Sequence, residues 1–101
     1  MSMANLQRMA QQMQQEMLRI QSELEGLTVD GSAGGGVVKA TVTGKQEVVS
    51  VSIDPSAVDA SDVEMLQDLI VAAVNDALKK SRDTAEQKMS AVTGGLRLPG
   101  M

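Results

Sequence analysis

The first 27 residues carry apolar side chains at spacings that alternate between three and four. This spacing places one apolar stripe along a helix and matches the a and d positions of a heptad repeat. Glutamines fill much of the remaining surface, and neither proline nor glycine intrudes before Gly26. The pattern therefore predicts a helix from about residue 3 to residue 25, roughly 35 Å long. The stripe consists of Met3, Leu6, Ala10, Met13, Met17, Ile20, Leu24 and Leu27.

After Gly26 the apolar period changes to two, which is typical of half-buried strands. One short strand begins at Leu27 and Val29, a second covers residues 38–42, and a third covers residues 49–53. Short glycine-bearing links at 31–36 and 44–46 join them, as in antiparallel hairpins, whereas a parallel pair needs a crossover of about a dozen residues. We expect a three-stranded antiparallel meander with one covered face.

A second helix is expected after Asp54-Pro55, because proline cannot continue the strand. Ser61 and Glu64 have the spacing of a capping box at its start. Residues 66–78 are mostly apolar and are expected to be buried on several sides, and a narrower apolar stripe continues to Gly94-Gly95, which end the helix. The whole chain, 1–101, is then a single α+β domain whose long terminal helices overhang the sheet, with 94–101 as a flexible tail.

The amino-acid composition favours a dimer and excludes several classes of function. The 101 residues include no aromatic side chain, so a monomer has a thin core, and a homodimer with an isologous interface is the simplest way to enlarge it. With neither cysteine nor histidine, most familiar catalytic and metal-binding chemistries are excluded. We expect no enzyme activity, no catalytic residue, no cofactor and no metal site, and the acids near the second helix start are explained by the helix dipole. No signal peptide or membrane span is expected, which favours a cytoplasmic protein.

The glycine-rich stretch at residues 31–45 raises the question of a phosphate-binding loop. A Walker A motif ending in Gly44-Lys45 requires glycine at 39 and a hydroxyl at 46, and those positions hold Lys39 and Gln46. Both nucleotide motifs also need a helix to follow, whereas a strand is expected here. The stretch is interpreted as turns within the sheet, where glycine permits positive φ or the close approach of another backbone.

The net charge of −4 is unevenly distributed. Residues 46–76 hold seven acids and no base, whereas residues 77–101 hold five bases and two acids. The basic side chains do not form one face of the second helix, and three i,i+4 pairs are expected to neutralise part of them: Asp76 with Lys80, Lys79 with Asp83, and Arg82 with Glu86. From these residues alone a solvated, self-paired helix surface is favoured over DNA binding.

The chain resembles the YbaB/EbfC family of bacterial nucleoid-associated proteins over about residues 4–101. The resemblance is carried by GGGVVKATVTGKQEVVSVSIDPS, MLQDLIVAAVNDALKKS and the closing MSAVTGGLRLPGM. It implies an intertwined homodimer whose protruding helices form a pair of arms associated with DNA binding. The candidate DNA-binding residues are the basic ones on those helices, Arg8, Arg19, Lys79, Lys80, Arg82 and Lys88. The candidate interface residues are Leu6, Met13, Met17, Ile20, Leu24, Leu69, Ile70 and Val74.

The sequence therefore predicts a non-enzymatic homodimer that binds double-stranded DNA in the cytoplasm and organises the nucleoid or modulates transcription. No membrane and no small-molecule substrate is expected as a partner. Contacts to phosphate and to duplex shape are expected to dominate over base readout. The alternative is a dimeric coiled-coil scaffold whose helices bind another protein.

Overall fold

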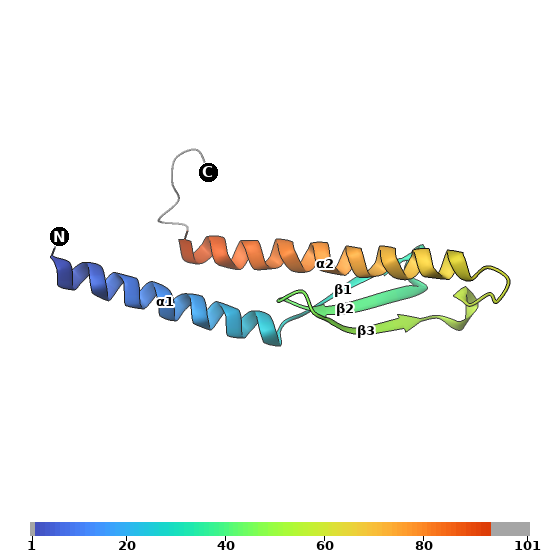
Figure 1. Cartoon of the computed structure of the whole chain (residues 1–101), viewed down its shortest axis with the longest axis horizontal. Helices are drawn as coiled ribbons and strands as arrows, with labels where there is room; N and C mark the ends of the chain where they lie inside the picture. Colours follow the sequence, from blue (N-terminus) through green and yellow to red (C-terminus); the bar gives the residue numbers. More distant parts are fainter. Residues whose placement is uncertain (1, 94–101) are drawn as a thin grey trace, which may run out of the picture.

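The computed structural model describes residues 2–93, which form two long helices and a three-stranded sheet. The elements run in the predicted order, with the two helices side by side and both extending past the same end of the sheet (Figure 1). The predicted helix end at Gly94-Gly95 and the tail 94–101 lie outside the described residues. The elements are α1 (Met3–Gly26), β1 (Thr28–Ala33), η1 (Gly34–Gly36), β2 (Val38–Thr43), β3 (Val48–Ile53), η2 (Pro55–Ala57) and α2 (Val63–Thr93).

The sheet is an antiparallel meander of order β1-β2-β3, which confirms the predicted topology. β1 is longer than predicted, because Gly31 and the two residues after it belong to the strand and not to the loop. Gly31 lies directly under α2. A Cβ added there would lie 2.6 Å from the carbonyl oxygen of Ala73 and 2.7 Å from Cα of Ala77. Only glycine lets the strand pass this close to the helix backbone.

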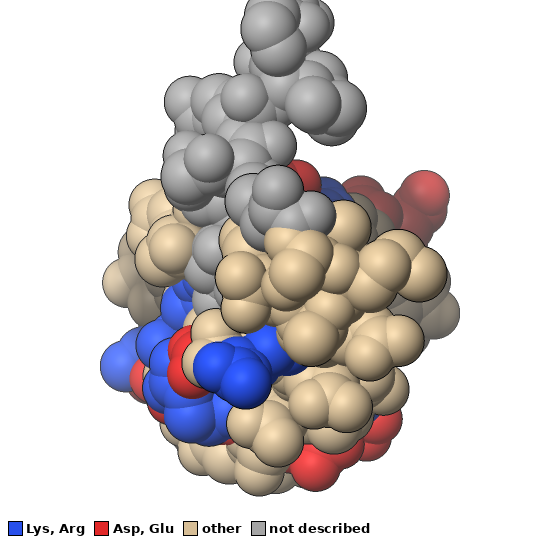
Figure 2. All heavy atoms as spheres, turned by 90° about the vertical axis from the view of Figure 1, so that its left-hand side faces the viewer, with Lys and Arg blue, Asp and Glu red and all other residues tan. Residues whose placement is uncertain are grey.

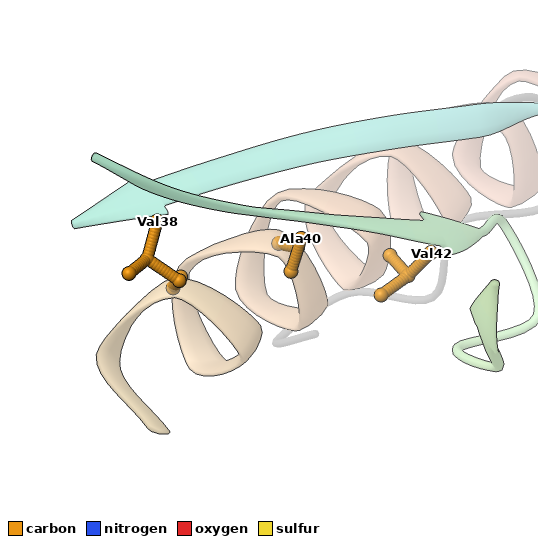
Figure 3. Close-up of a cluster of buried hydrophobic side chains, with 5 residues drawn as sticks. Val38, Ala40 and Val42 are labelled. Atoms are coloured by element: carbon orange, nitrogen blue, oxygen red, sulfur yellow. The ribbon is translucent and has the colours of Figure 1, made fainter. Parts of the chain in front are cut away.

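The core lies between α2 and one face of the sheet. Val38, Ala40 and Val42 alternate along β2, and Figure 3 shows their side chains pointing toward the helix. These three residues, together with Ala73 and Ala77 of α2, are fully buried. Because alanine and glycine line the contact, helix and sheet approach closely and little side-chain volume is enclosed.

The apolar side chains of β3 are more exposed than the sequence predicts. Val51 is paired with Ala40 and Val48 with Val42, so these valines share the face that α2 covers on β2, yet they are 40% and 50% exposed. A β-bulge next to Val42 leaves Val49 as an extra residue, and it is 58% exposed. The expectation that the apolar face of the third strand is covered is therefore wrong within the described chain, because α2 lies over β1 and β2. We call Val48, Val49 and Val51 the open valine patch.

The start of α2 also corrects the sequence analysis. The helix begins at Val63, and the carboxylate of Asp62 accepts a hydrogen bond of 3.2 Å from the backbone N–H of Met65. Asp62 is thus the N-cap. The predicted cap, Ser61, instead donates its hydroxyl to Asp59 at 2.6 Å.

The apolar half of α2 is buried on one side and not on several. Ala73 and Ala77 are fully buried and Ile70 is half-buried, but Val71 is 58% exposed. α2 therefore also leaves apolar surface uncovered within the described chain.

The glycine-rich stretch has the structural role that its sequence suggests. Gly34, Gly35 and Gly36 form η1 with φ of +66°, +74° and +96°, a region that side chains with a Cβ rarely adopt. The strand β2 follows, so no helix N-terminus is present to bind a phosphate at this turn. This confirms its interpretation as a turn.

Candidate nucleic-acid interface

The helices leave the sheet at one well-defined place. The buried hydroxyl of Ser81 donates a 2.7 Å hydrogen bond to the carbonyl of Thr43, and the backbone N–H of Gly44 donates to the carbonyl of Leu24 at 2.9 Å. Beyond this point α2 continues to Thr93 for about 18 Å, and α1 extends outward for roughly 32 Å. We call residues 3–23 of α1 and 82–93 of α2 the arms. Their overhang confirms the predicted excess of helix over sheet.

The arms contact each other close to the sheet. Ile20 and Leu24 are buried there, and Met13 and Met17 are half-buried. Farther out on α1 the apolar side chains are more exposed, with Leu6 at 50%. The inner part of the heptad stripe is therefore covered within one chain, whereas its outer part is not covered by the described residues.

Three of the six predicted DNA-binding residues are held in ion pairs. Arg19 lies 2.6 Å from Glu16 and 2.5 Å from Glu23. The other oxygen of Glu23 lies 3.6 Å from the ammonium of Lys88, which links the two arms. The hydrogen bond and the charge of Arg19 lower the pKa of Glu16. The third, Lys80, lies 3.1 Å from a carboxylate oxygen of Asp76, as the i,i+4 spacing predicts.

The same oxygen of Asp76 accepts a 3.0 Å hydrogen bond from the backbone N–H of Ser32. This bond, with a smaller contribution from Lys80, lowers the pKa of Asp76. Asp76 therefore fastens α2 to β1 and also neutralises one candidate cation.

The other three candidates, Arg8, Lys79 and Arg82, are exposed and form no ion pair with any other described residue. The predicted pairs of Lys79 with Asp83 and of Arg82 with Glu86 are thus not formed, and that expectation was wrong. Arg8 and Arg82 lie on the arms, whereas Lys79 lies one turn of α2 before them. Viewed from the free end of the arms, basic side chains gather on one side with acidic ones among them (Figure 2).

The predicted interface residues divide between the two helices. On α2, Leu69, Ile70 and Val74 are half-buried against the core of their own chain. Of the five on α1, only Leu6 is exposed. Sequence reasoning missed the open valine patch, because the alternation in β3 shows that one face is apolar but not which element covers it.

Three further features of the described part of the chain concern metals, small ligands and membranes. Among residues 2–93 no cluster of three carboxylates is placed to hold a metal ion. A shallow hollow on α2 is lined by Asp83, Glu86, Gln87 and Ser90, and its two carboxylates disfavour a phosphate. Within the same range neither helix combines the length and apolarity that crossing a membrane requires.

Comparisons with known proteins agree with this architecture. The model of the YbaB/EbfC DNA-binding family matches residues 1–96. Nucleoid-associated proteins of Pelotomaculum thermopropionicum and Moorella thermoacetica are 51% and 53% identical, with 99% of this chain and 95% and 99% of theirs covered. The crystal structure of an uncharacterized protein from Helicobacter pylori has a similar fold, with a TM-score of 0.72 at 23% identity, covering 95% of this chain and 97% of that one.

Proposed function

The chain belongs to the YbaB/EbfC DNA-binding family, and from that premise we propose that it binds duplex DNA as a homodimer. We further propose that binding organises the nucleoid or modulates transcription in the cytoplasm. The two relatives at 51% and 53% identity that carry the name nucleoid-associated protein support this role. The observation that carries the proposal is a set of three exposed cations on or beside the arms that form no ion pair with a described residue, Arg8, Lys79 and Arg82.

These cations favour contacts to the phosphate backbone. The chain has no aromatic side chain on which an unstacked base could lie, so single-stranded nucleic acid is a poorer partner than duplex. Binding through phosphates depends steeply on salt, because each neutralised phosphate releases a condensed counterion. If each of the three free cations in each subunit contacts one phosphate, log K falls against log salt with a slope of about −5.

The experiment is a duplex-binding titration over a salt series. In a variant carrying Lys79→Ala and Arg82→Ala, a dimer loses four contacts, so the slope should flatten to about −2. The control, Lys39→Ala, removes one positive charge away from the arms, from an exposed lysine at the far end of β2, and should leave the slope close to that of the parent. Absence of duplex binding at low salt would reject the function, and an unchanged slope in the double variant would reject the role of Lys79 and Arg82.

A homodimer is supported by the open valine patch. An exposed apolar edge strand is an aggregation hazard unless something covers it, and β3 is such a strand. In an isologous dimer the same surface of each copy packs against the other. Such a dimer buries the open valine patch and brings two pairs of arms into one particle. Two pairs of arms double the number of phosphate contacts without requiring any new basic residue.

The dimer is tested by sedimentation over a concentration series. Val51→Asp should shift the protein toward monomer, because it places a charge inside the proposed interface. Ser52→Asp makes the same charge change one residue away on the opposite face of β3 and should leave the dimer intact. A parent protein that is monomeric at all concentrations would refute the dimer.

The alternative function, a scaffold that binds another protein, is favoured by one observation. On the outer part of α1, Met3, Leu6 and Met9 are 76%, 50% and 49% exposed, which is the kind of surface that a partner helix covers. A dimer that shows no duplex binding at low salt would turn the assignment toward this alternative.

A further inference from the structure

Glu23 faces two cations at once, one on each helix. Its Oε1 atom lies 2.5 Å from Arg19 on α1, and its Oε2 atom lies 3.6 Å from the ammonium of Lys88 on α2. We propose that Glu23 is a positioning residue that withholds Lys88 from duplex phosphate and, together with Glu16, withholds Arg19, and so limits both the affinity and the salt dependence of DNA binding. This proposal rests on the DNA-binding function proposed above.

The charges of the cluster cancel. Arg19 and Lys88 face Glu16 and Glu23, so two cations and two carboxylates form a group of zero net charge where the arms are joined. All four side chains lie at the surface, with exposures between 36% and 55%. A phosphate that approaches either cation therefore also approaches a carboxylate. Replacing Glu23 alone leaves the cluster with one net positive charge.

Two arginines lie on the same side of α1 but differ in their partners. Arg8 and Arg19 are eleven residues apart, close to three full turns, so they lie on the same side of the helix about 16 Å from each other. Arg8 forms no ion pair within residues 2–93, whereas Arg19 is held by two carboxylates. Because Glu16 and Glu23 hold Arg19 together, replacing Glu23 alone leaves Arg19 paired with Glu16 and frees Lys88 on the neighbouring helix.

The test measures duplex binding by Glu23→Gln over a salt series. We expect about threefold tighter binding at low salt and a slope steeper by about one for each subunit, because Lys88 is released while Glu16 still pairs with Arg19. Glu86→Gln is the matched control, since Glu86 lies on the α2 arm, is exposed and forms no ion pair with a described residue. It makes the same change in net charge and should have a smaller effect.

A double-mutant cycle separates the release of Lys88 from the change in the net charge of the protein. Lys88→Gln in the parent should weaken binding less than about twofold, because Lys88 is already neutralised, whereas in the Glu23→Gln background it should cancel the gain. Circular dichroism reports whether each variant keeps its helices. Equal gains from Glu23→Gln and Glu86→Gln, or an equal loss from Lys88→Gln in both backgrounds, would overturn this inference alone. A parent protein without duplex binding would overturn the proposed function as well.

Discussion

Replacing Gly31 with alanine tests the close approach of β1 to the backbone of α2. The new Cβ would lie 2.6 Å from the carbonyl oxygen of Ala73 and 2.7 Å from Cα of Ala77. Both atoms are backbone, so no side chain can rotate away and α2 must move off the sheet. Overpacking of a core typically costs about 1–3 kcal/mol, and because the obstacle here is backbone we expect about 3 kcal/mol or more.

Two other glycines isolate the cause. At Gly35 a Cβ meets open space but φ is +74°, so Gly35→Ala should cost only about 1 kcal/mol. At Gly26, the last residue of α1, nothing lies within 4 Å and φ is not in the left-handed region, so Gly26→Ala should be neutral or stabilising by less than about 1 kcal/mol.

The assay is urea unfolding followed by far-ultraviolet circular dichroism, with all variants at one protein concentration because a dimer makes the midpoint depend on it. The expected order of destabilisation is Gly31→Ala, then Gly35→Ala, then Gly26→Ala. If Gly31→Ala were no worse than Gly35→Ala, the close approach of β1 to α2 would be refuted.

Four further substitutions test single hydrogen bonds by the same unfolding assay. Asp62→Ala removes the N-cap of α2 and should cost about 1 kcal/mol, whereas Ser61→Ala should cost less, which reverses the ranking that the sequence suggests. Ser81→Ala removes the buried hydroxyl that donates to Thr43 and should cost about 1 kcal/mol, since that carbonyl keeps its hydrogen bond from the N–H of Gln46. The N–H of Ser32 lowers the pKa of Asp76 below its ordinary value of 3.8, so this contact stabilises the fold above that pH and is lost as the pH falls further. Asp76→Asn should therefore reduce the loss of stability between pH 5 and pH 2, and an unchanged acid dependence would contradict the assignment.

Local periodicity predicted the parts of the fold that neighbours in sequence determine. The heptad stripe predicted α1, and the alternation from Val38 to Val42 predicted β2 and its buried face. What the pattern could not predict is which strands one helix covers. That choice depends on Gly31 meeting Ala73 and Ala77, a contact between residues more than forty positions apart.

The same limit applies to the candidate interface. The i,i+4 rule correctly predicted the pair of Asp76 and Lys80 but also predicted two pairs that do not form. It could not predict that Glu23 meets Lys88, because these residues belong to different helices and meet only where the arms are joined. The six basic candidates look equivalent in the sequence, and only tertiary structure divides them into paired and unpaired cations.

The distribution of charge along α2 bears on how an acidic chain can bind a polyanion. Glu64 and Asp68 lie in the first two turns of the helix, whereas Arg82 lies on its arm, about 20 Å or more away along the axis. At physiological salt the Debye length is about 8 Å, so the acidic end scarcely opposes a phosphate held at the arms. At 0.01 M salt it reaches about 30 Å, and the acidic end then repels the same phosphate. Affinity for DNA should therefore rise less steeply toward very low salt than counterion release alone predicts. The number of phosphate contacts is then given by the slope of log K against log salt measured at about 0.1 M and above.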